Sequence, residues 1–412
     1  MPLAGYPGVS RTSTGLRDPL LASAVHLRGG SGGIIIISLD LLHIDPPFAH
    51  RIRQGVCEAT GTREQNVFVV ANQNHSGPAA CKSLYLQNDP SYSEPPAGYL
   101  DTVLKQSVLA ASEAAVASCP ASIAFIQLDK PGCGAMIVKS DKGRLIGLVV
   151  VSDQAPRYHG PANTQVSSDF LHVLRQKLAA RFGGAPVVAY LVAPSGDSIL
   201  DDPPAFGEGP VSAAGEAMAS LIVTRVKALK PGDFTANLEM GGRLHDIPTL
   251  SPRVLPSLMD AASAVAVASD EVAAQQKFRA DPSMRRIARW TMTEASRTMG
   301  FVVAQQKGLT ADIIKETQTA QLHEIQIGKV RILGIPGAVT AECGRVLLSM
   351  LGDNTWLAEG HDGDLQGSIL YHDPRQKVGY RLLSGLLKPE IGNLLAALVI
   401  SFSTRMADRP GA

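Results

Sequence analysis

Short apolar runs alternate with amphipathic segments along this chain, and this alternation is typical of an α/β protein. Two runs, IIIISLDLL at 34–42 and NVFVVA at 66–71, are rich in β-branched residues and predict buried strands. Between them, residues 47–60 carry apolar side chains at helical spacing behind a proline start. Because a strand, a helix and a strand follow one another, we expect a right-handed parallel crossover here.

The remaining segments continue this pattern. Further strands are predicted at 121–128, 145–151, 187–192 and 355–358, with two more in 322–335 around a Gly328-Lys329 turn. Further helices are predicted at 99–118, 170–182, 215–229 and 389–403, and one more at Pro336 or just after it. Residues 232–245 show strand-like alternation.

An Ala-rich stretch at 256–306 is helical by periodicity and is interrupted near Asp281 and Pro282. We interpret it as an inserted helical segment that packs as a hairpin or a lid. Strands are predicted on both sides of it, which favours a single domain over residues 1–412. The predicted fold is therefore α/β, with a mixed sheet core flanked by helices and one inserted helical segment.

Composition narrows the class of protein. The net charge is +1 and the basic residues are scattered, so we expect no nucleic-acid partner. The longest apolar runs are far shorter than the roughly 20 residues of a membrane span, and the first residues do not resemble a signal peptide. Five cysteines, an odd count without CxxC spacing, indicate reduced thiols and a cytoplasmic location.

Polar residues follow the predicted strand at 66–71, where α/β proteins usually place a site. They are Gln73, Asn74, His75 and Ser76. His75 is the best single candidate, as a general acid or base or as a hydrogen-bond donor to a bound carbonyl. The alternative is that His75 only orders the turn at the end of the strand.

Other predicted strands end in polar residues as well. Asp40 ends one strand, and a carboxylate there could orient the imidazole of His43, although solvated polarity explains the pair equally well. Asp153 and Gln154 follow the strand at 145–151 and point to the same cleft, or else cap a turn.

Two loops add further candidates. Ser195, Asp197 and Ser198 could form a nest of backbone amides for an anion or oxyanion, with a plain turn as the alternative. Another loop carries His361, Asp362 and Asp364, a set that metals favour and that is also common on surface loops. There is no G-x-S-x-G motif of a hydrolase serine.

An ordered set of segments resembles the catalytic N-terminal domain of the neutral/alkaline, non-lysosomal ceramidase family. The segments are PLAGYPG, TGLRDPLLASAVHL, IIIISLDLL, NVFVVANQNHSGPAA, GRLIGLVVVSDQAPRYHGPANTQVSSDF, VVAYLVAPSGDS, HEIQIGKVRILGIPGAV and GHDGDLQGSIL. The resemblance runs from about Met1 to about Phe402 and is weakest at 215–307. It implies a mixed α/β fold and zinc-dependent amide hydrolysis of N-acyl-sphingosine. Secreted members continue into an Ig-like C-terminal domain, which we expect to be absent here.

The resemblance also assigns zinc ligands, and this sequence departs from them. The first histidine of the family's HTHSGPGG is Gln73, and the histidine of its CHP segment is Ala155. The glutamate of its PGE segment is Ala338, and the tyrosine of its NDYxGY loop is Leu365 or Ser368. Imidazole and carboxylate donors supply the binding free energy for zinc, so we expect neither zinc nor another cofactor.

The nucleophilic serine of the family's GDVSPN-like segment corresponds to Ile199, with Ser198 one residue out of register. Our first hypothesis is a diverged hydrolase or acyl-transfer enzyme that acts on an amide or ester bond of a small soluble substrate. Its catalytic candidates are His75, Asp153, Asp197 and Asp40. Its substrate-contacting candidates are Gln73, Asn74, Ser76, Gln154, Ser195, Ser198 and Asp364.

Two other hypotheses remain open. The chain could be a non-catalytic binding or scaffold protein that keeps the fold without the site. It could also hold a new metal set that joins His75 to Asp153, Asp364 or His361. The sequence carries no sign of the oligomeric state.

Overall fold

The structure is a computed structural model of the chain. It describes residues 1–6, 9–29, 32–82, 92–195, 206–248, 252–278, 281–317, 319–360, 368–369 and 392–399. Its strands are β1 (Gly15–Leu16), β2 (Ala22–Gly29), β3 (Gly32–Leu39), β4 (Val67–Ala71), β5 (Ala121–Gln127), β6 (Gly134–Ser140), β7 (Leu145–Ser152), β8 (Gln165–Val166), β9 (Val187–Val192), β10 (Met240–Asp246), β11 (Gln321–Ile327), β12 (Val330–Ile335), β13 (Ala338–Val339), β14 (Thr355–Glu359) and β15 (Ser368–Ile369). Its helices are α1 (Pro46–Thr60), α2 (Tyr99–Val116), α3 (Phe170–Phe182), α4 (Glu208–Ala228), α5 (Leu258–Lys277), α6 (Pro282–Gln306), α7 (Thr310–Thr317) and α8 (Ala341–Leu351).

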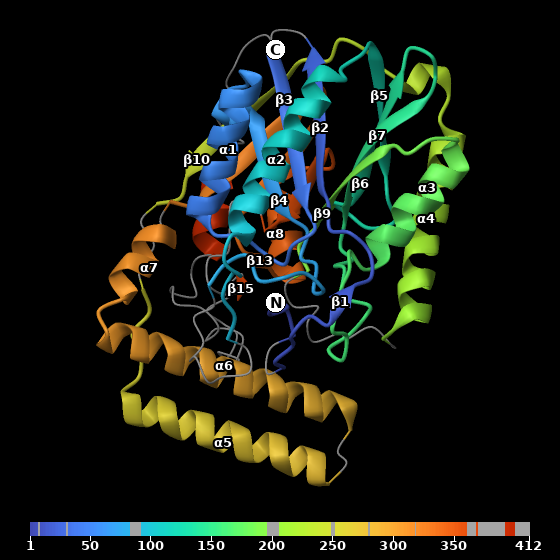
Figure 1. Cartoon of the computed structure of the whole chain (residues 1–412). Coiled ribbons are helices and arrows are strands. Elements are labelled where there is room, and N and C mark those ends of the chain that lie inside the picture. Colours follow the sequence, from blue (N-terminus) through green and yellow to red (C-terminus); the bar gives the residue numbers. More distant parts are fainter. Residues whose placement is uncertain are drawn as a thin grey trace.

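Three mixed sheets form the centre of the molecule (Figure 1). Their strand orders are β2-β3-β4, β5-β6-β7-β9 and β10-β11-β12-β14. Each sheet has one parallel pair of strands at one of its sides, namely β3–β4, β7–β9 or β12–β14. The other pairs of neighbouring strands in each sheet are antiparallel. This arrangement confirms the predicted mixed α/β fold with helices around the sheets.

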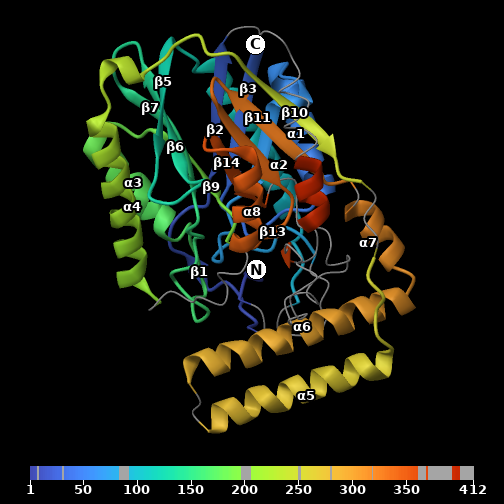
Figure 2. The same ribbon diagram turned by 180° about the vertical axis from the view of Figure 1, so that it is seen from behind.

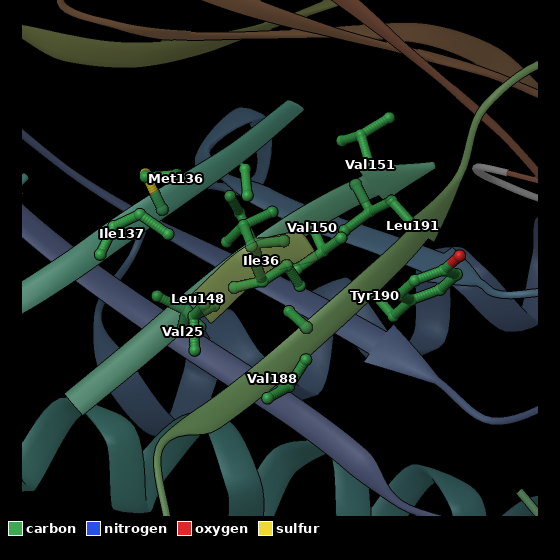
Figure 3. Packing of buried hydrophobic residues seen from close by; sticks show 14 of the residues in the cluster. Val25, Ile36, Met136, Ile137, Leu148, Val150, Val151, Val188, Tyr190 and Leu191 are labelled. Carbon is green, nitrogen blue, oxygen red and sulfur yellow. The ribbon is translucent and has the colours of Figure 1, made fainter. Parts of the chain in front are cut away.

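The four consecutive isoleucines of β3 explain why its sequence does not alternate. Ile34 and Ile36 belong to the large core cluster shared with β6, β7 and β9, as Figure 3 shows for Ile36. Ile35 and Ile37 pack on the opposite face, in the cluster that includes α1 and α2 residues. A strand with both faces buried needs apolar side chains at every position.

Helix α1 shows how local sequence sets an element's ends. The Asp45 side chain caps the helix by accepting a hydrogen bond from the Phe48 backbone N–H at 2.8 Å. Pro46 occupies the first helical position, where a missing N–H costs nothing. At the other end Gly61 has φ +70°, a left-handed cap conformation that favours glycine. The helix begins one residue before the predicted position.

Several other elements differ from prediction. Strand β6 and strand β2 were not expected, and β10 (Met240–Asp246) covers only the end of the segment predicted at 232–245. Helix α4 begins at Glu208 rather than Gly215, because Gly209 and Pro210 are tolerated in a first turn. Helix α8 begins at Ala341 because 338–339 form β13. Of the helix predicted at 389–403, residues 392–399 are described and are helical.

Helices α5 and α6 pack against each other and confirm the predicted hairpin with a break near Asp281. Both views show the hairpin lying across one end of the molecule (Figures 1 and 2). Its role as a lid and the assignment of 1–412 to one domain stay predictions. Among the described residues no helix has the length and apolar character required to cross a membrane.

Candidate functional site

The carboxyl ends of the three parallel strand pairs meet at one edge of the molecule. The His75 N–H, after β4, donates to the Pro156 carbonyl, after β7, at 2.9 Å. The Ser195 N–H, after β9, donates to Glu359 Oε1, at the end of β14, at 3.1 Å. In Figure 1 this edge lies at the lower end of the sheets, near β13 and β15. Ligand sites of α/β proteins form at such edges, so this is the candidate site.

Asp40 lies at this edge but is fully engaged by protein groups. Arg175 holds both carboxylate oxygens, with Nη1 to Oδ2 at 2.7 Å and Nη2 to Oδ1 at 2.9 Å. The Asn72 side chain and the Leu21 backbone N–H donate to the same carboxylate at 2.7 and 2.9 Å. These donors occupy the lone pairs that catalysis would need. We therefore assign Asp40 a structural role.

Asn74 and Ser76 order the chain after β4. Asn74 Nδ2 donates to the Ser167 carbonyl at 2.8 Å and to the Asp40 carbonyl at 3.2 Å, and its Oδ1 accepts from the Ser76 N–H at 3.1 Å. Ser76 Oγ accepts from Asn163 Nδ2 at 3.1 Å. Both side chains are fully buried. Their hydrogen bonds fix the loop instead of facing a ligand.

His75 is enclosed by the N-terminal segment. The Tyr6 ring packs edge-on against the imidazole, with ring centroids 4.9 Å apart. A Cβ at Gly5, which has φ +92°, would lie 2.7 Å from His75 Nδ1, so glycine is required there. Arg11 Nη2 donates to the His75 carbonyl at 2.8 Å. Nδ1 itself is buried and has no hydrogen-bond partner among the described residues.

The surroundings of His75 keep its imidazole neutral. Burial lowers the pKa of His75 well below its ordinary value, and the positive charges near it at Arg157, Arg11 and His43 lower it further. A neutral imidazole hydrogen-bonds well but is a weak base when its pKa is this low. This setting favours a hydrogen-bonding role for His75 over proton transfer.

Asp153 and Gln154 follow β7, as predicted. Asp153 pairs with Lys130 and is partly exposed, so its charge is already compensated. The Gln154 carbonyl accepts from the Tyr190 hydroxyl at 2.8 Å, whereas its side-chain Oε1 is buried without a partner among the described residues. The side-chain oxygen of Gln154 could therefore accept a hydrogen bond from a ligand.

Glu359, the last residue of β14, is fully buried at the same edge and was missed by the sequence reasoning. Ser195 donates to Glu359 Oε1 through both its hydroxyl, at 2.7 Å, and its N–H, at 3.1 Å. The Val339 N–H donates to Oε2 at 2.7 Å. Burial raises the pKa of Glu359 to about 8, against these donors, which lower it.

Gln73 contributes to the same cluster. Its side chain hydrogen-bonds to Glu359, and its backbone adopts φ +60°, which turns the chain sharply after β4. The available sequence signal for Glu359 was an acidic residue directly after the apolar strand predicted at 355–358. The same signal points to Asp40 at the end of its strand.

Several predicted residues lie outside the described part of the chain. They are Asp197, Ser198, Ile199, His361, Asp362, Asp364 and Leu365.

The described residues do not fit the zinc ion that the family resemblance implies. Ala155 and Ala338 have no donor atoms, and the Gln73 amide is bonded to Glu359. Glu359 also accepts from Val339, which follows Ala338, so its carboxyl lies beside two of the assigned ligand positions. No group of three or more His, Cys, Asp or Glu side chains in the described ranges is placed to hold a metal.

Comparison with known proteins identifies the architecture. No protein-family model and no curated protein sequence matches the chain. A solved structure of a ceramidase complexed with C2 matches with a TM-score of 0.62 and 12% identity, over 95% of this chain and 75% of that one. Neutral ceramidase from Pseudomonas aeruginosa matches with a TM-score of 0.61 and 11% identity, over 100% of this chain and 74% of that one. The chain therefore has a neutral ceramidase-like fold, as its ordered motifs predict.

Proposed function

We propose that this protein is a metal-independent hydrolase or acyl-transfer enzyme that acts on an amide or ester bond of a small soluble substrate. The observation that carries the proposal is the 2.7 Å hydrogen bond from Ser195 Oγ to Glu359 at the carboxyl edge of the strands. With a pKa of about 8, Glu359 is a stronger base than an ordinary carboxylate and exchanges its proton near neutral pH.

In the proposed reaction Ser195 is the nucleophile. Its Oγ forms a bond to the substrate carbonyl carbon while its proton passes to the Glu359 carboxylate. Glu359 then returns this proton to the leaving nitrogen or oxygen as the bond to the carbonyl carbon breaks. A water or an acceptor alcohol then attacks the acyl carbon while its proton passes to Glu359, and Glu359 gives this proton to Ser195 Oγ as the bond from Oγ to the acyl carbon breaks.

Two other groups would orient the substrate. Gln154 Oε1, buried without a partner among the described residues, would accept a hydrogen bond from a substrate N–H. Neutral His75, whose Nδ1 faces Gly5, would orient the substrate indirectly by holding the N-terminal segment in place. Asp153, Asn74 and Ser76 would keep the surrounding loops in place.

Active-site labelling tests this proposal without a known substrate. A small alkyl fluorophosphonate should modify Ser195, with the adduct located by peptide mass spectrometry. Ser195→Ala should abolish the adduct, and Glu359→Gln should slow labelling by about 10²–10⁴-fold because the general base is lost. The labelling rate should rise with pH and reach half its maximum near pH 8, where Glu359 loses its proton.

Ser349→Ala is the matched control, because Ser349 is an exposed serine whose hydroxyl donates to the Val346 carbonyl at 2.7 Å. It should label like the wild type. Labelling that persists in Ser195→Ala, or that Glu359→Gln leaves at the wild-type rate, would contradict the proposed pair.

A non-catalytic role in ligand binding is the second candidate. The observation that favours it is that protein groups already satisfy the polar atoms of Asp40, Asn74 and Ser76. A binding protein would show no fluorophosphonate adduct at Ser195 and no turnover of small N-acyl amides or esters.

We also propose that the protein works in the cytoplasm. All five cysteines are free thiols in the structure, and Cys81, Cys133 and Cys343 are buried. Unpaired thiols are typical of a reducing compartment. This proposal is consistent with a small soluble substrate.

A further inference from the structure

We propose that the opposite edge of the central strands binds a small amphiphile with an anionic head group. This edge lies where β2 ends and β3 begins, at the upper end of these strands in Figure 1. It holds two cavities that share His26, Arg28 and Met240 in their walls. We call the two cavities together the distal cleft.

One cavity of the distal cleft is polar and has a volume of about 680 Å³. Arg28 and Arg63 line it together with His26, Asn66 and the main chain of several glycines. No acidic residue is among the described residues of its wall. A wall with guanidinium groups and without carboxylates is suited to a phosphate or carboxylate group.

The other cavity has a volume of about 480 Å³ and a largely apolar wall. Val25, Leu27, Val138 and Leu238 contribute to this wall, and Arg144 is also part of it. The described wall again includes no Asp or Glu. Such a surface accommodates an alkyl or aromatic group, for which each buried methylene contributes about 0.8 kcal/mol.

The arginines of the distal cleft are available to a ligand. Arg28, Arg63 and Arg144 are exposed, and none is paired with a carboxylate among the described residues. By contrast, the exposed Arg225 is held by Asp129 at 2.9 Å. Unpaired guanidinium groups at the wall of a cavity can bind an anion without first giving up an internal partner.

At the wall of the distal cleft, glycines let neighbouring segments of the main chain approach each other closely. A Cβ at Gly242 would lie 1.7 Å from the Gln65 carbonyl oxygen, and one at Gly29 would lie 2.8 Å from the Leu238 carbonyl oxygen. Side chains at these positions would push the strands apart. The glycines therefore let the main chain itself form the surface of the distal cleft.

Because the two cavities share part of their walls, a single ligand could occupy both. Arg28 reaches the polar and the apolar cavity, so an anionic head bound at Arg28 and Arg63 would place an attached alkyl chain beside Met240 and Leu238. Each cavity is within the size range of small-molecule sites. The ligand class is thus an alkyl phosphate or alkyl carboxylate.

Calorimetric titration of the full chain tests this inference. Octyl phosphate and octanoate, below their micelle concentrations, probe the two sources of the head group. At least one of them should bind more tightly than inorganic phosphate and more tightly than octanol, because head and chain both contribute. Arg28→Ala and Arg63→Ala should each weaken binding about tenfold, the loss expected for one charge-assisted hydrogen bond.

Arg225→Ala is the control and should leave the affinity unchanged. All three arginines are exposed, so the variants should fold, which the far-UV circular dichroism spectrum checks. Failure of both amphiphiles to bind, equal affinity for inorganic phosphate, or insensitivity to Arg28→Ala and Arg63→Ala would overturn the inference. Ser195→Ala should bind like the wild type, so this result is independent of the proposed function.

Discussion

Glu359 and Asp40 are both buried carboxylates at the ends of strands, and the structure compensates them in different ways. Asp40 has the full opposite charge of Arg175 against both oxygens. Glu359 has only neutral donors, from Ser195, Val339 and Gln73. Neutral donors offset less of the cost of burying a charge, so Glu359 keeps a proton to a higher pH.

This difference predicts a pH dependence of stability. The folded state of Glu359 has a pKa of about 8 against 4.5 for an ordinary glutamate, so the unfolded chain releases the proton first. The free energy of unfolding should therefore fall as pH rises from about 4.5 to about 8, by roughly 2–4 kcal/mol from this group. A glutamine at position 359 does not titrate, so the free energy of unfolding of Glu359→Gln should fall less with pH than that of the wild type. Urea unfolding at pH 5 and pH 8.5 measures it.

The measurement must compare the wild type with Glu359→Gln, because another buried glutamate also titrates in this pH range. Glu294 on α6 is also buried, with a pKa raised to about 7, and it contributes a decline of the same sign in both proteins. Only the difference between wild type and Glu359→Gln belongs to Glu359. Equal slopes with pH in the two proteins would show that Glu359 is ionised throughout.

Asp40 should behave as a structural residue. Asp40→Asn leaves Arg175, whose side chain is only 13% exposed, without its counter-charge. We expect a loss of about 3–5 kcal/mol in the free energy of unfolding at pH 7. Asp129→Asn, which breaks the exposed pair with Arg225, should leave the denaturation midpoint nearly unchanged. A mild effect of Asp40→Asn would show that the pair is not stabilising.

At the scale of elements, strand β3 connects the core to the candidate site. Its isoleucines fill the clusters on both sides of the sheet, and Asp40 follows directly at the site edge. The parallel pairing of β3 with β4 places the turn with Gln73 and His75 at the same edge. The position of the site therefore depends on how firmly β3 is packed.

Truncation on either face of β3 should be equally costly. Ile35→Ala and Ile36→Ala each remove a fully buried side chain, from opposite faces, and should each cost about 2–5 kcal/mol in urea unfolding. Leu16→Ala in β1, where the side chain is 67% exposed, should change stability by less than about 0.5 kcal/mol. A clear asymmetry between the two isoleucines would mean that one face of β3 is loosely packed.

At the scale of the whole molecule, the fold is neutral ceramidase-like, while the described residues at its strand edge do not fit the zinc ion that the family resemblance implies. The similarity in structure spans nearly the whole chain at 11–12% identity. Gln73 bonds to Glu359, and the side chains of Ala155 and Ala338 carry no donor atoms. The fold tolerates this because the apolar clusters that stabilise it lie between the sheets and under the helices.

Metal removal should therefore have no effect on the protein. Prolonged dialysis against a chelator should leave the thermal unfolding temperature and the fluorophosphonate labelling rate unchanged, because the part of the chain that the structure describes contains no group of three His, Cys, Asp or Glu side chains placed to hold a metal. Zinc content by mass spectrometry should stay well below one ion per chain. Stoichiometric zinc that is lost together with stability on chelation would contradict this prediction.

Much of the fold could be predicted because its signals are local. The apolar run of β3, the periodicity of α3 and the break between α5 and α6 all appear within a few consecutive residues. Strand β6 was not predicted, although its partners β5 and β7 are its direct neighbours along the chain. Its Gly134 lies under the Trp356 ring, a contact that no local pattern reveals.

The sequence by itself determined the class of fold and the polar character of the strand ends, because both depend on residue type and order. Only the tertiary structure decided which polar groups meet. It bonded Asp40 to Arg175, surrounded His75 with positive charge, and placed Ser195 against Glu359, a residue 164 positions away. Burial and the nearest charges set the chemistry of a side chain, and both are properties of the folded chain.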